Sequence, residues 1–298
     1  MSRCFYVKCE DGFVNLEAVQ ENTQEVLNEG YTVKMEEYEP TEGQGGCFYI
    51  EGESSRGVHV YKEDDNILVK INILCNYSDY VVARIILDMF SQVFEQDVLD
   101  DENEVINVRE YFTDEKIQKL REEDANNFYT VLKTVVEDNI QIPGLIRSVY
   151  FGKNLTKILS NHENDPKAMV AILDMTMQRV QYALPDFNMP GVLLVRPQDS
   201  DNEKDFKKIR VMSEGHDYIL QDYDYLAIYI DDENADTNKK LIFIDNKDLI
   251  EIISQIDSEY TKMEVVDDFT VVFPKLEGKE WQKFVELARP KNHKELLD

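Results

Sequence analysis

A pattern of strand, polar turn, strand and helix occurs three times along the chain and constrains its fold more than any other feature. It covers residues 57–95, 225–257 and 261–288. In the first copy, every odd position from Ile67 to Cys75 is apolar, as in a strand with one buried face. Apolar residues then recur at helical spacing from Val82 to Phe94. Because strands joined by a short turn pair antiparallel, the pattern predicts hairpins accompanied by helices.

The expected fold class is therefore α+β, with mainly antiparallel sheets built from hairpins, recurring ββα units and helices packed on one face. Regular strand–helix–strand crossovers are not evident, which disfavours a doubly wound parallel sheet. The three copies share a pattern rather than identical residues. Two explanations of the recurring pattern stay open. We favour the view that hairpins followed by helices are simply common in such folds, and the alternative is internal duplication.

Further helices are predicted by apolar stripes and capping residues. One stripe, over residues 16–28, contains Leu16, Val19, Val26 and Leu27, and Val93 belongs to the stripe of the helix that precedes residue 95. Others are expected over 113–137, near 153–160 and from 166 to 184. The expected capping residues are Asn15, Asn76 and Ser78, Thr113, Asp165 and Asn246.

Breaks in this pattern suggest three segments. Residues 95–110 are strongly acidic and form an expected surface connection, and Pro143-Gly144 ends the helical region that follows. We expect an N-terminal acidic α+β domain over 1–112, a helical middle segment over 113–190 and a C-terminal α+β domain with two ββα units over 191–298.

The charge of the chain limits its partners. Among 298 residues there are 60 acids and 32 bases, which gives a net charge of −28. Such a surface disfavours direct binding to nucleic acid and to anionic membranes. From Glu10 to Asp65 there are fifteen acids and only three bases. This density fits a docking face for a basic partner, and it equally fits a solvated surface that keeps the protein soluble.

The compartment is expected to be the cytoplasm. No run approaches the ~18 apolar residues of a membrane helix, and the first residues lack the apolar stretch of a signal peptide. The four cysteines, Cys4, Cys9, Cys47 and Cys75, contain no C-x-x-C pair. We favour small apolar residues of a reduced protein over a metal site or a disulfide.

No motif in the sequence locates a catalytic, binding or metal site. The four histidines, His59, His162, His216 and His293, lack zinc-ligand spacing, and His59 is expected to be an exposed strand residue. Thr41–Gly46 and Gly152-Lys153 do not match phosphate-binding loops. Two acidic segments, Asp199–Asp205 and Asp232–Asn238, fit polar turns better than calcium loops. We therefore expect no metal and no cofactor, and the site residues stay unknown.

Three segments resemble an uncharacterised bacterial family that is known only as a domain of unknown function. They are Ser54–Asp65, the strand Ile67–Cys75 and Phe269–Lys275. The resemblance implies a bacterial cytoplasmic setting, and it supplies no activity and no site residue.

The best functional hypothesis from sequence is a non-enzymatic cytoplasmic protein that uses an acidic surface to recognise a basic protein partner. The alternative is an enzyme of unrecognised type with a carboxylate-lined or metal-dependent site. Because no apolar docking patch can be identified in the sequence, we expect a monomer.

Overall fold

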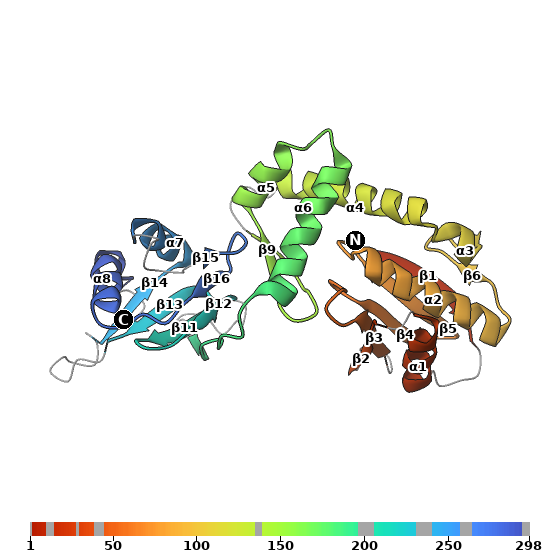
Figure 1. Cartoon of the computed structure of the whole chain (residues 1–298), viewed down its shortest axis with the longest axis horizontal. Coiled ribbons are helices and arrows are strands. Elements are labelled where there is room, and N and C mark those ends of the chain that lie inside the picture. Colours follow the sequence, from red (N-terminus) through yellow and green to blue (C-terminus); the bar gives the residue numbers. More distant parts are fainter. Residues whose placement is uncertain are drawn as a thin grey trace. The chain divides into compact units, whose positions relative to one another are not determined.

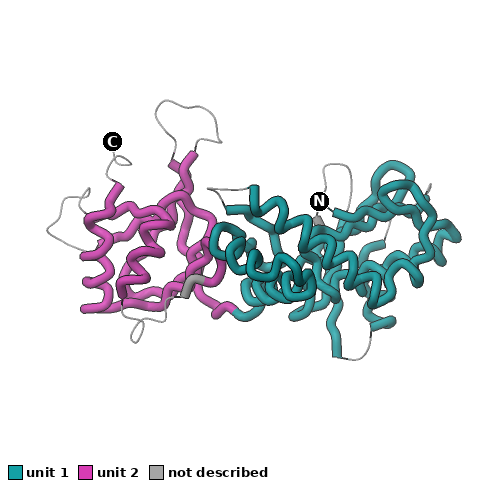
Figure 2. The backbone as a smooth tube through the Cα atoms, turned by 90° about the horizontal axis from the view of Figure 1, so that it is seen from above, with its two compact units in different colours: residues 1–183 teal, residues 184–298 magenta. Residues whose placement is uncertain are grey.

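The computed structural model of the chain describes residues 2–9, 15–27, 30–38, 45–134, 139–195, 206–230, 240–256 and 264–293. It divides into two compact units, residues 1–183 and 184–298, which Figure 2 colours separately. The sequence suggested three segments, with boundaries after residues 112 and 190. In the structure, the helical segment that begins near residue 113 lies in the same unit as the residues before it.

The first unit is built around a seven-stranded sheet in which every described strand pair is antiparallel. Its strands, in spatial order, are β2 (Val33–Tyr38), β3 (Gly45–Ile50), β4 (Val58–Glu63), β5 (Asn66–Asn72), β1 (Ser2–Lys8), β6 (Val98–Leu99) and β7 (Val105–Ile106). The first strand of the chain is thus inserted between β5 and β6.

Two helices, α1 (Leu16–Val26) and α2 (Tyr77–Phe94), cover one face of this sheet (Figure 1). The apolar side of α2 is buried against Phe5, Phe48 and Val69 on three different strands. Asn15 caps α1, because its side chain accepts a hydrogen bond from the Ala18 backbone amide. The short helix α3 (Val108–Tyr111) closes the sheet beside Phe5.

The remainder of the first unit is mainly helical. It contains α4 (Asp114–Thr134), the hairpin β8 (Ile140–Ile142) and β9 (Val149–Phe151), α5 (Lys153–Ser160), and α6 (Pro166–Gln178), which continues as a π-helix over Arg179–Ala183. The predicted caps Thr113 and Asp165 are confirmed, since their side chains accept hydrogen bonds from Lys116 and Ala168 backbone amides. Ile117 of α4 is fully buried in the core under α2, which joins this helix to the sheet layer.

The second unit contains a four-stranded and a three-stranded sheet. The larger sheet has the order β10 (Val192–Val195), β11 (Lys207–Ser213), β13 (Tyr225–Tyr229) and β14 (Leu241–Ile244). The smaller sheet has the order β12 (Tyr218–Leu220), β16 (Val271–Phe273) and β15 (Glu264–Val265). The helices are α7 (Asn246–Gln255) and α8 (Lys279–Ala288), and a 3₁₀ turn over Arg289–Lys291 follows. Leu226, Ile252 and Phe284 meet in one core between sheet and helices.

The fold class predicted from sequence is confirmed. The chain is α+β, and the described strand pairs are antiparallel apart from β11–β13. The ββα order recurs as β4-β5-α2, β13-β14-α7 and β15-β16-α8. Within the described residues, no helix combines the length and the apolar character needed to cross a membrane.

Several local expectations need correction. Val26 and Val93, assigned to buried helical stripes, are 66% and 67% exposed. Asp245 rather than Asn246 caps α7, because its carboxylate accepts the hydrogen bond from the Asp248 amide. The segments Asp199–Asp205 and Asp232–Asn238, and all of Thr41–Gly46 except its last two residues, lie outside the described residues.

Candidate functional site

The position of α2 is fixed by a buried carboxylate. Asp79 is inaccessible to solvent, and its oxygens accept hydrogen bonds from the backbone amides of Ser55, Arg56, Gly57 and Asn76 and from the Ser55 hydroxyl. The distances are 3.0–3.3 Å. Because five donors compensate its charge, this carboxylate ties the loop between β3 and β4 to the start of α2. Ser55, Arg56 and Gly57 belong to the Ser54–Asp65 segment on which the resemblance to a bacterial family was based. Their hydrogen bonds to Asp79 give these residues a structural role.

A groove runs between α1 and α2. It has a volume of about 760 Å³ and adjoins a second hollow of about 310 Å³, since Val26, Arg84 and Ile85 line both. Exposed apolar side chains are concentrated along it: Val26 and Val93 in the larger hollow, and Tyr31 and Tyr77 in the smaller one. Contiguous exposed apolar surface on a soluble protein marks a binding surface more often than chance exposure does.

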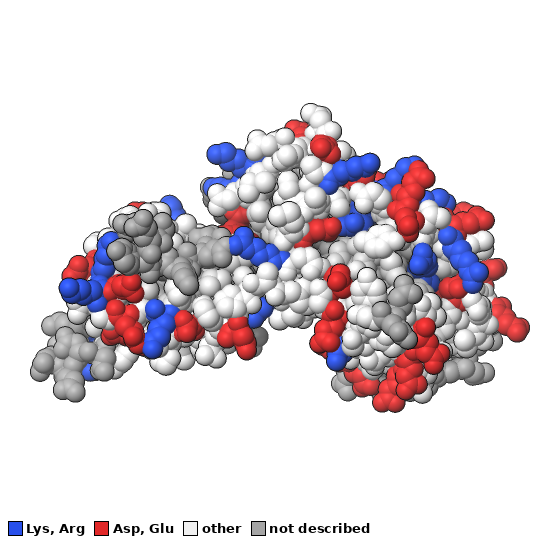
Figure 3. All heavy atoms as spheres, viewed as in Figure 1, with Lys and Arg blue, Asp and Glu red and all other residues white. Residues whose placement is uncertain are grey.

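Helix α1, which borders the groove, is acidic. Glu17, Glu21 and Glu25 are four residues apart, so they lie on one face of the helix, and all three are exposed. Helix α1 contains no basic residue. Glu25 lines the groove itself. In the part of the chain that the structure describes, none of these carboxylates forms an ion pair. Figure 3 shows acidic side chains gathered over this end of the first unit, with few basic ones among them.

Two arginine side chains line the other side of the groove, Arg84 from α2 and Arg109 from α3. Arg109 donates two hydrogen bonds to Asp88 and forms an ion pair with it at 3.0 Å, so its charge is compensated. Arg84 lines both hollows and has no ion pair among the described residues. The groove thus brings together Glu25 from an acidic helix, several apolar side chains, and Arg84, which has no ion pair among the described residues.

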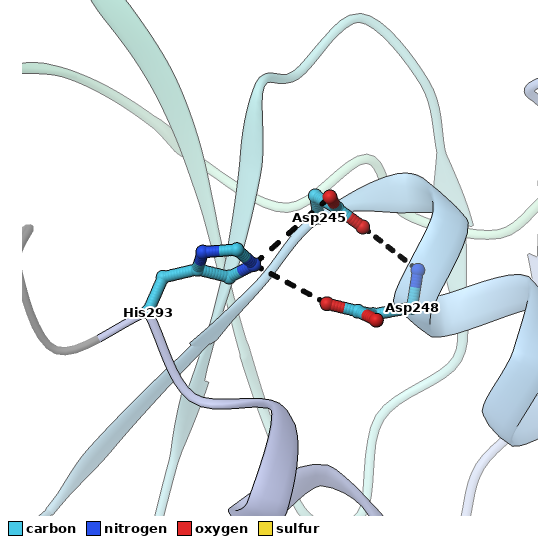
Figure 4. Close-up of side chains that lie close together, drawn as sticks. All are labelled: Asp245, Asp248 and His293. Carbon is cyan, nitrogen blue, oxygen red and sulfur yellow. Dashed lines mark hydrogen bonds and ion pairs between the residues drawn. The ribbon is translucent and has the colours of Figure 1, made fainter.

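A second cluster lies in the other unit at the start of α7. The Nε2 atom of His293 lies 3.2 Å from Asp248 and 3.9 Å from Asp245 (Figure 4). One ligand atom from each of the three side chains lies within 4.8 Å of the others, a spacing that suits a divalent cation. No metal was predicted from the sequence, because His293 is remote from both aspartates along the chain. The i, i+3 spacing of the aspartates was the one visible signal.

This cluster already has a structural role. The Lys291 ammonium bridges Asp248 at 3.0 Å and Glu251 at 2.7 Å. The backbone of His293 donates to the Phe243 carbonyl, and the Asn292 side chain accepts from the Phe243 amide. Together these contacts hold the segment after α8 against β14 and α7.

The remaining histidines are isolated from such groups. His59 on β4 is half-buried rather than exposed, which corrects the sequence-based interpretation. Burial lowers its pKa to about 4, and the charges of Arg56 and Lys70 act in the same direction. His162 follows α5 and His216 is exposed in a turn, and neither belongs to a group that could hold a metal among the described residues.

The cysteines are all free thiols. Cys47 lies 3.7 Å from the Arg56 carbonyl, and Cys75 lies 3.5 Å from that of Gly57. Burial, followed by the charge of Asp79, raises the pKa of Cys47 to about 12 and that of Cys75 well above its usual range. Because a neutral thiol is a poor nucleophile, neither side chain is suited to covalent chemistry.

Comparison with protein-family models, curated proteins and solved structures gives no match for this chain. The resemblance to a bacterial family of unknown function therefore stays a prediction. The functional argument rests on the geometry of the groove and of the Asp245–Asp248–His293 cluster.

Proposed function

We propose that the chain is a non-enzymatic binding protein that recognises a basic protein partner through the groove between α1 and α2. One observation carries this proposal: the three exposed carboxylates of α1, of which Glu25 lines the groove, form no ion pair among the described residues and accompany exposed apolar side chains in the groove. The apolar side chains favour burial against a partner, and the carboxylates attract cationic side chains over longer distances.

The groove also suggests how such a partner is oriented. An amphipathic segment would place its apolar residues against Val26, Ile85 and Val93. Its basic residues would face Glu21 and Glu25 on the α1 side. On the α2 side, Arg84 would repel a cation, so the partner is expected to present a neutral or acidic residue there.

A pair of synthetic helical peptides tests the proposal. Both carry the same leucine pattern, and the polar positions are lysine in one and glutamate in the other. Fluorescence anisotropy with the full chain should detect binding of the lysine peptide, weakening as salt is added. Substituting Glu17, Glu21 and Glu25 by Gln should weaken binding roughly tenfold, because three exposed charge pairs are lost.

A matched variant controls for net charge. Glu102 and Glu104, between β6 and β7, and Glu286 on α8 are exposed acids that do not line the groove and form no ion pair among the described residues, and their triple change to Gln removes the same charge. It should leave the affinity nearly unchanged, and Arg84→Gln should raise it. Equal losses in both triple variants, or equal binding of the two peptides, would contradict a specific acidic groove.

The expected setting follows from the same surface. We propose that the protein acts in the cytoplasm, which its four free thiols support. Its charge of −28 argues against direct contact with nucleic acid or an anionic membrane.

The alternative, an enzyme with a metal-dependent site, is favoured by one observation, the Asp245–Asp248–His293 cluster. The Lys291 ammonium competes with any cation there, because it already pairs with Asp248. Calorimetric titration of the full chain with Zn²⁺ and Mn²⁺ tests this alternative. Binding that is lost in His293→Ala and strengthened in Lys291→Met would support it, and absence of binding to both the native chain and Lys291→Met would exclude it.

A further inference from the structure

Strand β10 is an exposed apolar edge of the sheet in the second unit. Its residues Val192, Leu193 and Leu194 are 41%, 56% and 63% exposed, although all three are large and apolar. β11 pairs with one side of β10, and no described strand pairs with the other. An edge of this kind presents unpaired amides and carbonyls together with apolar side chains, which is the usual template for strand addition.

The edge is held in place by groups of its own unit. The buried guanidinium of Arg210 donates to the carbonyl of Pro190 at 2.7 Å, and the Val211 amide donates to the carbonyl of Gly191 at 3.3 Å. Asn188 also forms a bridge to Tyr218. Because the segment is fixed before any partner arrives, pairing at this edge costs little conformational entropy.

The direction of the free hydrogen-bonding groups follows from the register. Because the Val211 amide donates to the Gly191 carbonyl, the backbone hydrogen-bonding groups of Gly191 point toward β11. These groups alternate in direction along a strand, so those of Leu193 and Val195 also point toward β11. The amides and carbonyls of Val192 and Leu194 therefore point away from β11. Any strand added here must bond to these two residues.

We propose that a second copy of the chain adds to this edge, with β10 antiparallel to its symmetry mate. Only a register centred on Leu193 brings both outward residues of each copy into bonding pairs, Val192 with Leu194 of the mate and the reverse. Leu193 then lies opposite itself across the two-fold axis. The two four-stranded sheets become one eight-stranded sheet.

The local charge permits this contact in an otherwise repulsive molecule. Residues 187–195 contain no charged side chain, in a chain whose net charge is −28. The charges on the neighbouring strand are Lys207, Lys208 and the buried Arg210 of β11, which lie opposite Val195, Leu194 and Val192. In the paired sheet these lie three strand spacings from their counterparts, about 14 Å, which exceeds the ~8 Å screening length at physiological salt.

Cross-linking tests the register. In a non-bonded antiparallel pair the Cα atoms are about 4.5 Å apart, which a disulfide can span. We expect mild oxidation of Leu193→Cys to give a covalent dimer. Leu194→Cys should give far less, because its new thiol faces Val192 of the mate rather than another thiol. The native chain controls for Cys4, which is the least buried of the natural cysteines.

A proline variant tests the hydrogen bonding. Leu194→Pro removes an amide that β11 does not use, so the fold should be retained while the self-association constant falls roughly tenfold or more. Leu194→Lys should also weaken self-association, because it places a charge on the pairing edge while it keeps the backbone amide. Sedimentation velocity over a range of concentrations measures the effect. A native chain that remains a monomer throughout, with Leu193→Cys cross-linking no better than Leu194→Cys, would overturn the proposal.

Discussion

Among single residues, Gly57 is the most constrained position around the base of α2. Its φ is +69°, and a Cβ atom there would lie 2.6 Å from the Cys47 sulfur and 3.1 Å from the Phe48 carbonyl oxygen. Gly52 has a similar φ of +79° and open space around it. We therefore expect Gly57→Ala to lower the free energy of unfolding by about 2–4 kcal/mol, and Gly52→Ala by about 1 kcal/mol. Urea unfolding followed by circular dichroism measures both, and equal losses would show that the contact relaxes freely.

His59 gives the fold a pH dependence of predictable sign. Its pKa is about 4 in the folded chain, against about 6.5 when unfolded. The folded state disfavours the imidazolium, so its contribution to stability is complete above the unfolded pKa and is lost as pH falls towards the folded one. Relative to His59→Gln, the native chain should lose about 1–2 kcal/mol of unfolding free energy between about pH 7 and pH 5. Urea titrations of both proteins check this, and parallel pH profiles would rule it out.

At the scale of elements, one buried ion pair joins two helices. Arg121 of α4 is buried and pairs with Asp174 of α6. Burial raises the pKa of Asp174 although Arg121 opposes the rise. Asp174→Ala leaves the guanidinium uncompensated, so we expect a loss of about 3–5 kcal/mol of unfolding free energy. The double change Arg121→Met with Asp174→Leu should recover most of it.

An exposed pair in the same unit provides the control. Lys133 and Glu163 are 3.2 Å apart and both are largely solvated. Glu163→Ala should therefore cost less than about 1 kcal/mol in the same denaturation experiment. Similar costs at the two pairs would mean that burial does not govern the contribution of Arg121.

The sequence predicted elements with a long periodic signal and missed those without one. The alternation that begins at Ile67 predicted β5, and the helical spacing up to Phe94 predicted α2, which ends at that residue. Strands β6 and β7 have two residues each, too few to show alternation, and they were assigned to a connection. The parallel pairing of β11 with β13 depends on tertiary contacts and leaves no local pattern.

The groove was not predictable because its walls come from separate helices. Val26 and Val93 match a helical core pattern, and periodicity cannot tell a buried apolar face from one left open to a partner. The Asp245–Asp248–His293 cluster was not predictable for the same reason, because only folding brings its histidine close to the aspartates.

At the scale of the whole molecule, charge governs solubility. The isoelectric point calculated from the sequence is about 4.5, so the repulsion that separates molecules at neutral pH disappears near that value. We expect a solubility minimum there and high solubility at neutral pH. Light scattering across this pH range measures the solubility. The Leu194→Lys variant, measured in parallel, separates charge-driven precipitation from pairing through β10. Uniform solubility through the isoelectric point would contradict the prediction.

The insertion of β1 between β5 and β6 has a consequence for synthesis on the ribosome. β1 emerges well before its partners, and its first neighbour begins at residue 66 and its second at residue 98. During translation, at about 5–20 residues per second, the apolar side chains Phe5 and Val7 wait several seconds for the strands that will bury them. The nascent chain therefore passes through an interval in which these side chains are open to chaperone binding.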